Sequence, residues 1–437
     1  MGEVDTIFAL ATPPGRSALA VFRISGPTAV EALARITRGG GVRPRRPSLR
    51  SLYAATAEKI DDAVVTVFPG PASFTGEDCV ELSVHGSRSV ISALNATLAR
   101  IGGLRVAEPG EFTKRAFLNG RMDLTQAEAV ADLIDSETEF QRRQALRMLS
   151  GELGACVRAW RERILDVSAE IESSLDFSDE GDVDALDVRR LSSDVNALVA
   201  DIGRELERSG QSLRLRDGFT VVISGPPNAG KSTLFNLLVG EEAAIVTPVP
   251  GTTRDLISRD LDIAGAPIKL IDTAGIRDSS DEIEAIGVAR AREARCNADL
   301  VIELLPPGAT LPAGAVDGAP VLAVHSKTDV EPAPDGALGI TRNDPMAIRA
   351  LKERMAEAAL SVVGDGSEGR LIRERHVSSL TEARAALNRV PAHLERGYLE
   401  LAAEELRAAR SAIGALVGIT TTEDVLGAIF SRFCIGK

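Results

Sequence analysis

A glycine-rich stretch carries the clearest chemistry in the sequence. It reads GPPNAGKS at 225–232, follows the apolar run 219–223 and precedes a helix-like segment at 233–239. Glycines let successive backbone N–H groups turn toward phosphate oxygens, and the N-terminus of the following helix adds the positive end of its dipole. Lys231 can then reach the β- and γ-phosphates, and Ser232 can ligate Mg²⁺. The pattern predicts a phosphate-binding P-loop rather than an incidental turn.

Three further motifs follow in the order of a GTP-binding domain. GTTRD at 251–255 can supply a threonine hydroxyl to Mg²⁺ and an N–H to the γ-phosphate. The apolar run 268–271 ends in DTAG, where Asp272 can hold the water shell of Mg²⁺ and Gly275 can contact the γ-phosphate. The run 320–325 leads to SKTD, where the Asp329 carboxylate can accept two hydrogen bonds from guanine that adenine cannot offer. Together the motifs predict a GTPase.

The nucleotide motifs depart from the usual pattern in three places. Ser326 stands where GTPases usually carry Asn, and the segment 339–342 is the best candidate for the later base-contacting motif. Ile276 stands where Ras-like proteins carry the glutamine that positions water. Catalysis must then draw on another group. Asn228 fits either a ligand of a monovalent cation or an ordinary turn residue, and the loop alone does not choose between them.

The composition is that of an ordinary globular protein of about three domains. Of 437 residues, 44% are hydrophobic and 26% charged, and no apolar run approaches the length of a membrane span. The net charge of −13 argues against a protein that coats nucleic acid. Four scattered cysteines form no CxxC pair, and the acidic N-terminus does not fit an export signal, so we expect a cytoplasmic protein.

The elements around the motifs predict an α/β plus all-α chain. Residues 1–118 show strand-like runs at 6–10, 18–24, 64–68 and 79–84 and helical spacing at 29–36 and 90–101. A further strand is expected at 299–304, and long helices are expected at 125–150, at 157–175 and along the apolar stripe 188–206. We expect an N-terminal α/β domain (1–118) and a helical domain (119–216 and 376–437) interrupted by a Ras-like P-loop domain (217–375).

Several features outside the P-loop domain leave alternatives open. Cys79 and His85 favour a structural role, because no third catalytic group is identifiable. The acidic stretch 176–184 fits a solvated loop better than a cation site. A basic cluster at 43–50 fits either a solvated loop or a nucleic-acid contact, with the former favoured. Cys434 fits packing near the terminus better than a nucleophile.

Motifs along the whole chain resemble the MnmE (TrmE) family of tRNA-modification GTPases. They are ATPPGR at 11–16, FRISG at 22–26, FTGED at 74–78, PGEFTKRAFLNG at 109–120, DLTQAEA at 123–129 and FCIGK at 433–437. The resemblance implies a homodimer formed through N-terminal domains, with GTP hydrolysis activated by K⁺. It also implies a partner, the flavoprotein MnmG, in a heterotetramer or larger complex. FAD would reside on that partner only.

The resemblance also assigns a reaction and its cofactors. The family adds an aminomethyl or carboxymethylaminomethyl group to the wobble uridine of certain tRNAs, with GTP hydrolysis driving a conformational cycle. A 5-formyl- or methylene-tetrahydrofolate, bound by the N-terminal domain, supplies the carbon unit. The acidic charge suggests that tRNA is bound mainly with the partner. The alternatives are a ribosome-assembly GTPase and a regulatory GTPase, neither of which needs a folate-binding domain.

The candidate site residues combine the motifs with the family pattern. The catalytic candidates are Asn228 and Glu284. The Mg²⁺ candidates are Ser232 and Thr253, and the K⁺ candidates are Asn228, Thr247, Val249 and Thr252. The folate candidates are Arg23, Glu81, Lys437 and Arg121, the last standing where the family has Lys. The GTP-binding candidates are Asn228, Ala229, Gly230, Lys231, Ser232, Thr233, Thr247, Pro248, Val249, Pro250, Gly251, Thr252, Thr253, Asp272, Thr273, Ala274, Gly275, Ser326, Lys327 and Asp329.

Overall fold

The computed structural model places most of the chain in two compact units. It describes residues 5–39, 41–176, 186–242, 257–273, 292–311, 319–342, 344–364 and 369–436. One unit combines Met1–Ala131 with Gly414–Lys437, and the other is Asp132–Ile413. The C-terminal segment therefore belongs to the same unit as the N-terminal sheet.

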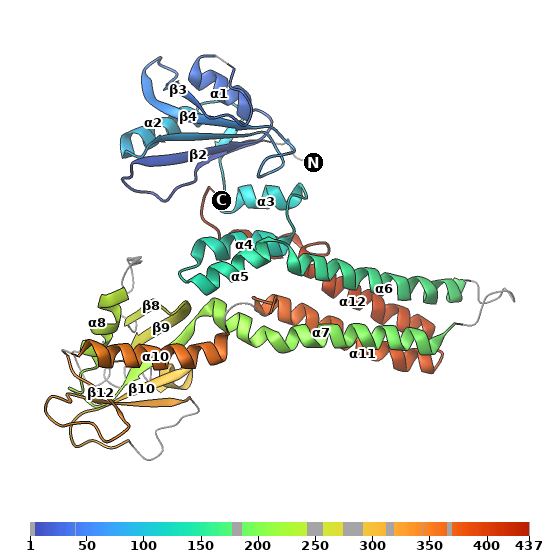
Figure 1. Ribbon diagram of the computed structural model, residues 1–437. Helices are drawn as coiled ribbons and strands as arrows, with labels where there is room; N and C mark the ends of the chain where they lie inside the picture. Colours follow the sequence, from blue (N-terminus) through green and yellow to red (C-terminus); the bar gives the residue numbers. More distant parts are fainter. Residues whose placement is uncertain are drawn as a thin grey trace, which may run out of the picture. The chain divides into compact units, whose positions relative to one another are not determined.

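The first unit is built on a six-stranded sheet of order β3-β4-β5-β2-β1-β6. Neighbouring strands are antiparallel except for the parallel β1–β6 pair (Figure 1). Helices α1 (Ala29–Thr37) and α2 (Arg88–Leu98) share one apolar core with the sheet. The strands and helices expected here are confirmed. Strands β3 and β6 were not foreseen. The strands are β1 (Thr6–Leu10), β2 (Leu19–Ser25), β3 (Ser48–Tyr53), β4 (Lys59–Phe68), β5 (Cys79–His85) and β6 (Leu104–Val106).

The C-terminal tail completes the first unit. Helix α13 (Glu423–Phe430) contributes Leu426 and Phe430 to a buried cluster that also contains Leu124 and Phe433, against which Phe117 of α3 (Glu111–Leu118) packs. Beyond that cluster the backbone N–H of Gly110 donates to the carbonyl of Cys434 at 3.4 Å. Cys434 is therefore held beside the start of α3.

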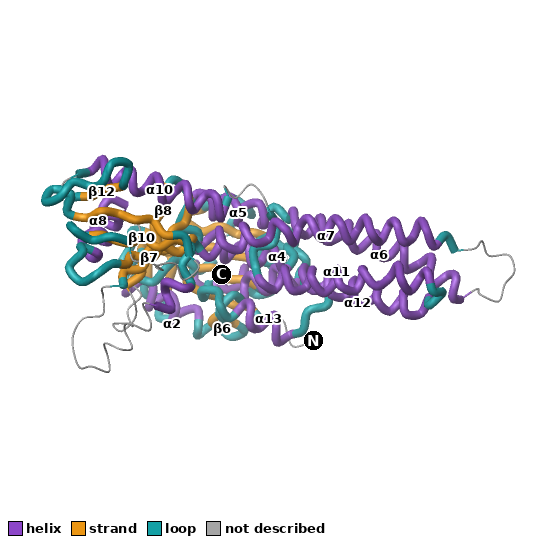
Figure 2. Tube along the Cα trace, turned by 90° about the horizontal axis from the view of Figure 1, so that it is seen from below, coloured by secondary structure: helices purple, strands orange, loops and turns teal. Residues whose placement is uncertain are grey.

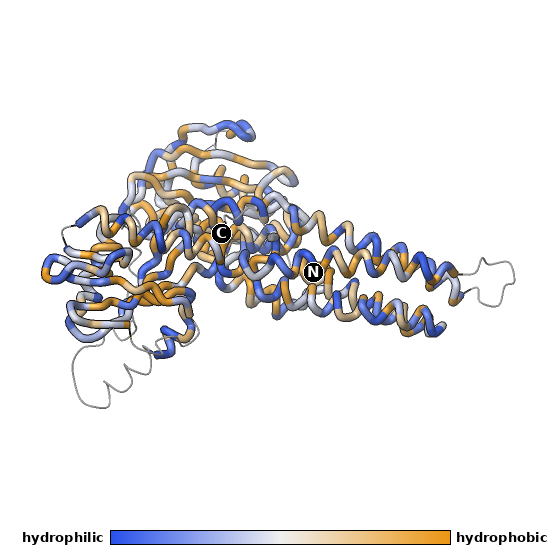
Figure 3. The backbone as a smooth tube through the Cα atoms, turned by 60° about the horizontal axis from the view of Figure 1, so that its bottom comes forward, coloured by the Kyte–Doolittle hydropathy of each residue, from blue (hydrophilic) through white to orange (hydrophobic). Residues whose placement is uncertain are grey.

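Long helices make up one part of the second unit. Figures 1 and 2 both show α6, α7, α11 and α12 running side by side, and in Figure 3 hydrophilic and hydrophobic colours alternate along them. The predicted stripe is confirmed, because Leu191, Val195, Leu198 and Ile202 are all buried on α7. The bounds are α6 (Glu152–Asp176), α7 (Val188–Asp217), α11 (Glu374–Glu395) and α12 (Leu399–Val417).

The single helix expected at 125–150 is wrong. The segment instead forms α4 (Leu124–Asp135) and α5 (Glu139–Leu149). The Thr138 side chain accepts a hydrogen bond from the backbone of Gln141, whose side chain bonds back to Thr138. This capping box satisfies donors that a helix start leaves open, so a new helix begins at Glu139 although apolar spacing continues through the break.

A second six-stranded sheet forms the rest of that unit. Its order is β12-β11-β10-β7-β9-β8, with all neighbours parallel except the β8–β9 hairpin. The sheet shares an apolar core with α8 (Lys231–Glu242) and α10 (Pro345–Val363). Four predicted strands are confirmed, and β8 and β12 were not foreseen. The strands are β7 (Phe219–Ser224), β8 (Ile257–Ile263), β9 (Ala266–Asp272), β10 (Leu300–Leu305), β11 (Val321–Ser326) and β12 (Leu338–Ile340).

Candidate nucleotide-binding site

The sheet brings the predicted nucleotide motifs to one edge. Strand β7 ends at Ser224 before the glycine-rich loop, β9 ends at Asp272, and β11 ends at Ser326. These strands and β10 run parallel. Because carboxyl ends of parallel strands open onto the same edge, three motifs that are distant in sequence lie together there. The predicted strand–loop–helix unit is also present, although the helix begins two residues earlier than expected.

The backbone of the glycine-rich loop requires its glycines. Gly225 has φ +141°, and a Cβ at that position would lie 2.6 Å from the carbonyl oxygen of Leu304 on β10. Gly230, just before α8, has φ +101° with nothing within 4 Å of an added Cβ. Asn228 also has a positive φ, of 64°. Asn tolerates this left-handed conformation better than most residues. Gly225 is thus fixed by close packing, whereas Gly230 is fixed by backbone conformation.

The start of α8 carries the expected phosphate-binding groups. Lys231 is the first residue of the helix, and its Nζ donates to the carbonyls of Gly225 at 2.8 Å and Pro226 at 3.0 Å. Ser232 and Thr233 are exposed in the first turn, while Ala229 is fully buried beneath the loop. The N-terminal amides and the lysine thus share one small region, as phosphate binding requires.

An ion pair that sequence reasoning missed supports the base of the loop. Arg295 Nη1 donates to Ser224 Oγ at 2.5 Å and lies 3.0 Å from Glu303 Oε2. Glu303 is only 5% exposed and lies opposite Ser224 in the β10–β7 pairing. The pair joins the last residue before the loop to the neighbouring strand. The sequence offered one signal for this ion pair. Glu303 lies inside an apolar strand, and a buried carboxylate needs a partner.

The DTAG motif begins at a buried strand end. Asp272 is 2% exposed, and Thr273 Oγ1 donates to the carbonyl of Ile223 on β7 at 2.8 Å. The first two residues of the motif therefore lie beside the strand that carries the glycine-rich loop. A carboxylate at this position suits the water shell of Mg²⁺, because that ion usually keeps several waters.

The SKTD motif forms a turn closed by the segment expected to contact the base. The backbone N–H of Thr328 donates to the carbonyl of Ile340 at 3.3 Å, and Thr341 Oγ1 donates to Asp329 Oδ1 at 3.1 Å. Lys327 has φ +58°. The segment 339–342 thus lies against Asp329. The Thr341 hydroxyl is a second group that sequence reasoning did not single out.

The substitution at the first position of this motif has a structural consequence. Ser326 is 6% exposed, and its Oγ makes no hydrogen bond to any described residue. A buried hydroxyl without a partner costs free energy. The shorter side chain therefore leaves a polar atom without a partner among the described residues, at the strand end beside the SKTD turn.

Other predicted nucleotide-site residues lie outside the described ranges. This set covers predicted residues between 247 and 253, the end of the DTAG motif, the position of the missing glutamine and the acidic catalytic candidate. Its members are Thr247, Pro248, Val249, Pro250, Gly251, Thr252, Thr253, Ala274, Gly275, Ile276 and Glu284.

The first unit brings the described folate candidates around one loop. Arg23 and Glu81 face each other on β2 and β5 and form an ion pair of 2.8 Å. The Arg23 guanidinium lies 5.0 Å from the centroid of the Phe74 ring. Two residues farther, a Cβ at Gly76 would lie 3.3 Å from Arg121 Cγ. The loop 74–76 thus contacts Arg23 and Arg121 alike, while Lys437 lies outside the described residues.

The remaining candidate groups make ordinary structural contacts. His85 Nδ1 lies 2.8 Å from Asp61 Oδ1. Burial alone would raise the pKa of Asp61, but hydrogen bonds from the backbone and ring of His85 outweigh it and lower that pKa. Cys79 is buried 3.1 Å from Thr75 Oγ1, and Cys434 is exposed. Neither cysteine shows an activating base among these contacts.

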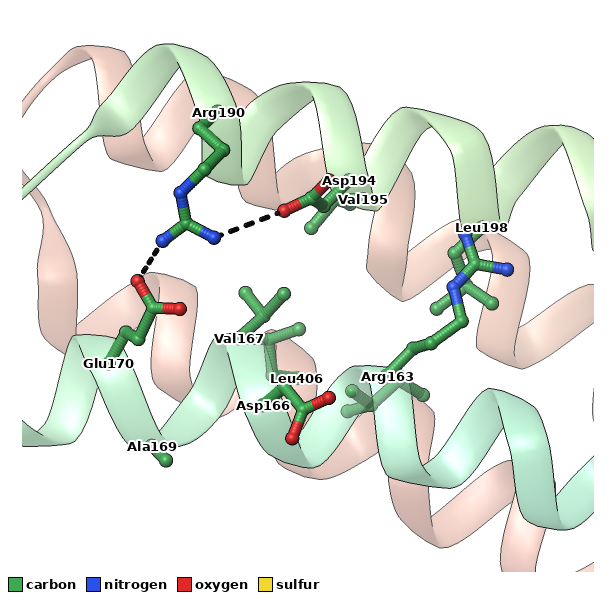
Figure 4. A pocket seen from close by; sticks show the side chains of 11 residues that line it. Arg163, Asp166, Val167, Ala169, Glu170, Arg190, Asp194, Val195, Leu198 and Leu406 are labelled. Carbon is green, nitrogen blue, oxygen red and sulfur yellow. Dashed lines mark hydrogen bonds and ion pairs between the residues drawn. The ribbon is translucent and has the colours of Figure 1, made fainter.

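A cavity of about 510 Å³ lies between α6 and α7, apart from the nucleotide motifs. Figure 4 shows Arg190 of α7 reaching Glu170 of α6 across it and Asp194 on its own helix, and these two ion pairs already use the charges that line one end. Within the described ranges, no three His, Cys, Asp or Glu side chains gather in a way that would hold a metal. The described helices also include none with the length and apolar character of a membrane span.

Comparisons with known proteins cover the whole chain. A family model for the GTP-binding protein TrmE N-terminus matches residues 6–121, and one for the MnmE helical domain matches 124–434. The tRNA modification GTPase MnmE of Methylobacterium sp. (strain 4-46) is 50% identical, covering 99% of this chain and 100% of that protein. Its namesake from Methylobacterium radiotolerans is 47% identical, with 100% of both chains covered. The solved G domain of the T. maritima FeoB iron transporter shares 23% identity, covers 32% of this chain and 98% of that one, and has a TM-score of 0.26, too low to support an inference.

Proposed function

The chain belongs to the MnmE family of tRNA modification GTPases, and from this membership and the site we propose how it works. It binds GTP at the edge where β7, β9 and β11 end, and hydrolysis drives a conformational cycle that serves wobble-uridine modification. The observation that carries this proposal is the convergence of GPPNAGKS, Asp272 and SKTD at one edge of a parallel sheet.

We propose that Lys231 binds the β- and γ-phosphates and that Ser232, with Thr253, ligates Mg²⁺. The exposed Ser232 hydroxyl, one residue into α8, fits such a ligand. Bound Mg²⁺ would neutralise charge on the phosphate oxygens. Asp329 would accept hydrogen bonds from guanine while Thr341 holds one of its oxygens.

We propose that Asn228 helps to hold K⁺, together with Thr247, Val249 and Thr252, and that Glu284 orients the attacking water. The Asn228 side chain is exposed on the loop and makes no hydrogen bond to a described residue, so its carbonyl oxygen is available to a cation. A cation there would supply positive charge near the phosphates, where no glutamine follows DTAG.

The test compares GTP hydrolysis by the full chain in K⁺ and in Na⁺ at equal ionic strength. We expect faster hydrolysis in K⁺, and we expect Asn228→Ala to lose most of that advantage. Asn297→Ala removes an exposed asparagine of the same unit and serves as the matched control. Equal rates in both salts, or equal behaviour of the two variants, would contradict the cation assignment.

The wider role is proposed from family membership. The chain would form a homodimer, act in the cytoplasm with the flavoprotein MnmG, and use a tetrahydrofolate derivative bound near Arg23, Glu81, Arg121 and Lys437. The open Arg23–Glu81 pair beside Phe74 offers a charged donor, a carboxylate and an aromatic ring to such a ligand. Nucleoside analysis of tRNA from cells lacking the protein tests this role, and an unchanged wobble uridine would exclude it.

A further inference from the structure

Five arginines of the first unit form a basic surface that the GTPase site does not use. We define the arginine surface as Arg38, Arg43, Arg45, Arg46 and Arg50. The sequence has no Asp or Glu between residues 32 and 57, although the whole chain carries 63 acidic against 50 basic residues. Arg50 lies on β3, the edge strand of the sheet, and the others lie in the segment between α1 and β3.

The five guanidinium groups have no carboxylate partner among the described residues. Arginines elsewhere in the chain are commonly paired, as Arg115 is with Asp5, Glu77 and Glu111. On the arginine surface, Arg43 and Arg46 make no side-chain hydrogen bond to a described residue, and both are exposed. Asp61 and Asp62 lie on the neighbouring strand β4, but they pair with His85 and Lys59 instead of these arginines. Positive charge that is not paired with a carboxylate attracts a polyanion.

The backbone of the surface is held in place. The N–H of Arg45 donates to the carbonyl of Val67 on β4 at 2.8 Å, and the side chain of Arg45 reaches the carbonyl of Ala72. Arg50 Nη2 donates to the carbonyl of Gly41 at 3.3 Å, which ties β3 to the same segment. These bonds hold the arginine-bearing segment against the sheet, so less ordering entropy is lost when a ligand binds.

An aromatic ring lies beside one of the five arginines. The guanidinium of Arg38 lies 4.3 Å from the centroid of the half-buried Tyr53 ring, at the far end of β3. Arginine and tyrosine planes are the groups on which unpaired RNA bases stack. We propose that the arginine surface binds the phosphate backbone of RNA. This inference rests on the proposed role in tRNA modification and adds to it a contact on this chain rather than on the partner.

The proposal predicts weak, strongly salt-dependent binding. The full chain is titrated into a labelled, unmodified tRNA transcript between ~25 and ~200 mM salt, and affinity is plotted against salt logarithmically. The variant R43Q/R46Q/R50Q removes three phosphate contacts. We expect its slope to be shallower by about two to three and its affinity at ~50 mM salt to be at least about tenfold weaker.

A charge-matched variant separates a local contact from total charge. R142Q/R349Q/R407Q removes three exposed arginines that pair with glutamates on their own helices, and we expect a slope close to that of the parent. Equal losses in both variants, or no tRNA binding by the parent at low salt, would overturn the proposal. The double variant R43Q/R46Q removes only side chains without bonds to described residues, so it preserves the test if the triple variant fails to fold.

Two further measurements distinguish failure of the RNA-binding proposal from failure of the proposed function. GTP hydrolysis by R43Q/R46Q/R50Q should equal that of the parent, because none of these residues lies in the nucleotide motifs. A parent that neither hydrolyses GTP nor affects wobble uridine would refute the proposed function instead. Binding of the parent to anionic lipid vesicles, lost in the triple variant while tRNA binding persists, would show a membrane contact and overturn the RNA assignment.

Discussion

Glycine-to-alanine substitutions at three positions give a graded test of the nucleotide loop. Gly225 combines a φ of +141° with only 2.6 Å between an added Cβ and the carbonyl oxygen of Leu304. A backbone strained in this way costs about 1–3 kcal/mol, and the clash with another strand adds to it, so we expect Gly225→Ala to cost more than about 3 kcal/mol. Gly230→Ala meets no such clash, so its cost is the backbone strain alone, about 1–2 kcal/mol.

The control lies in the helix that follows. Gly240 of α8 is exposed, and an added Cβ there meets nothing within 4 Å. Alanine is the better helix former, so Gly240→Ala should stabilise the helix by up to about 1 kcal/mol. Each variant adds one methyl group, but Gly225→Ala and Gly230→Ala should destabilise the protein and Gly240→Ala should stabilise it. A general effect of adding a methyl group cannot produce this difference.

Nucleotide affinity and local stability together provide the assay. Strain that the loop must absorb on binding lowers affinity about tenfold per 1.4 kcal/mol, so we expect losses of about 100-fold for Gly225→Ala and about tenfold for Gly230→Ala. Gly240→Ala should bind a fluorescent GTP analogue as the parent does. Because unfolding of a chain with several units is not two-state, stability is followed by hydrogen exchange of the β7 amides. Near-parental binding and exchange in Gly225→Ala would refute the proposed constraint from Leu304.

Other substitutions test separate parts of the molecule. Ser326→Ala removes a buried hydroxyl that has no described partner, so it should stabilise the nucleotide-free protein by about 1 kcal/mol. Its GTP affinity should be unchanged. A tenfold loss of affinity in a GTP titration would instead show that the hydroxyl forms a hydrogen bond when nucleotide is present. Asp329→Asn should weaken GTP binding and favour xanthosine triphosphate, because the edge of xanthine is complementary to the Asn side chain. A competition experiment between the two nucleotides would measure this change. Burial would raise the pKa of Glu111, but hydrogen bonds from Arg105, the Glu108 backbone and Arg115 outweigh it and hold that pKa below 4.5. The stability from this carboxylate is therefore present above pH 4.5 and is lost as pH falls through its lowered pKa. Hydrogen-exchange protection of the α3 amides, corrected for the intrinsic exchange rate and measured from pH ~6 to ~3, should therefore fall less steeply in Glu111→Gln than in the parent.

Sequence patterns predicted local structure best where one local rule sufficed. The glycine-rich loop, the strand ends at Asp272 and Ser326, and the buried stripe on α7 each follow from spacing within a short segment. Contacts across the sheet were not predictable in this way. Arg295 reaches Ser224 and Glu303 only because β7 and β10 are neighbours, and strand order is set by the whole core rather than by any single segment.

Elements with weak patterns were also missed. Strand β3 directly follows RPRRP at 43–47, a stretch that favours a loop, and its own burial pattern does not alternate, so the pairing with β4 supplies what local preference does not. Strand β12 has only three residues, too few for a periodic signal. The C-terminal tail is similar, because the fixed position of Cys434 depends on Gly110, which lies more than three hundred residues earlier.

The helix break at 136–138 links the helical part of the second unit to its sheet. Because the Thr138 cap starts a new helix, Phe140 lies in the first turn of α5 and packs against the core of the sheet. A Cβ at Gly265, in the β8–β9 turn, would lie 2.9 Å from Phe140 Cε1, so the turn must be glycine for the ring to approach. The same hairpin begins at Ile257, just after GTTRD, and ends at Asp272. A continuous helix through this segment would turn Phe140 to another direction and leave the hairpin uncovered. The apolar spacing continues through the break and does not reveal it. The Thr138 cap therefore determines how the helical part contacts the nucleotide domain.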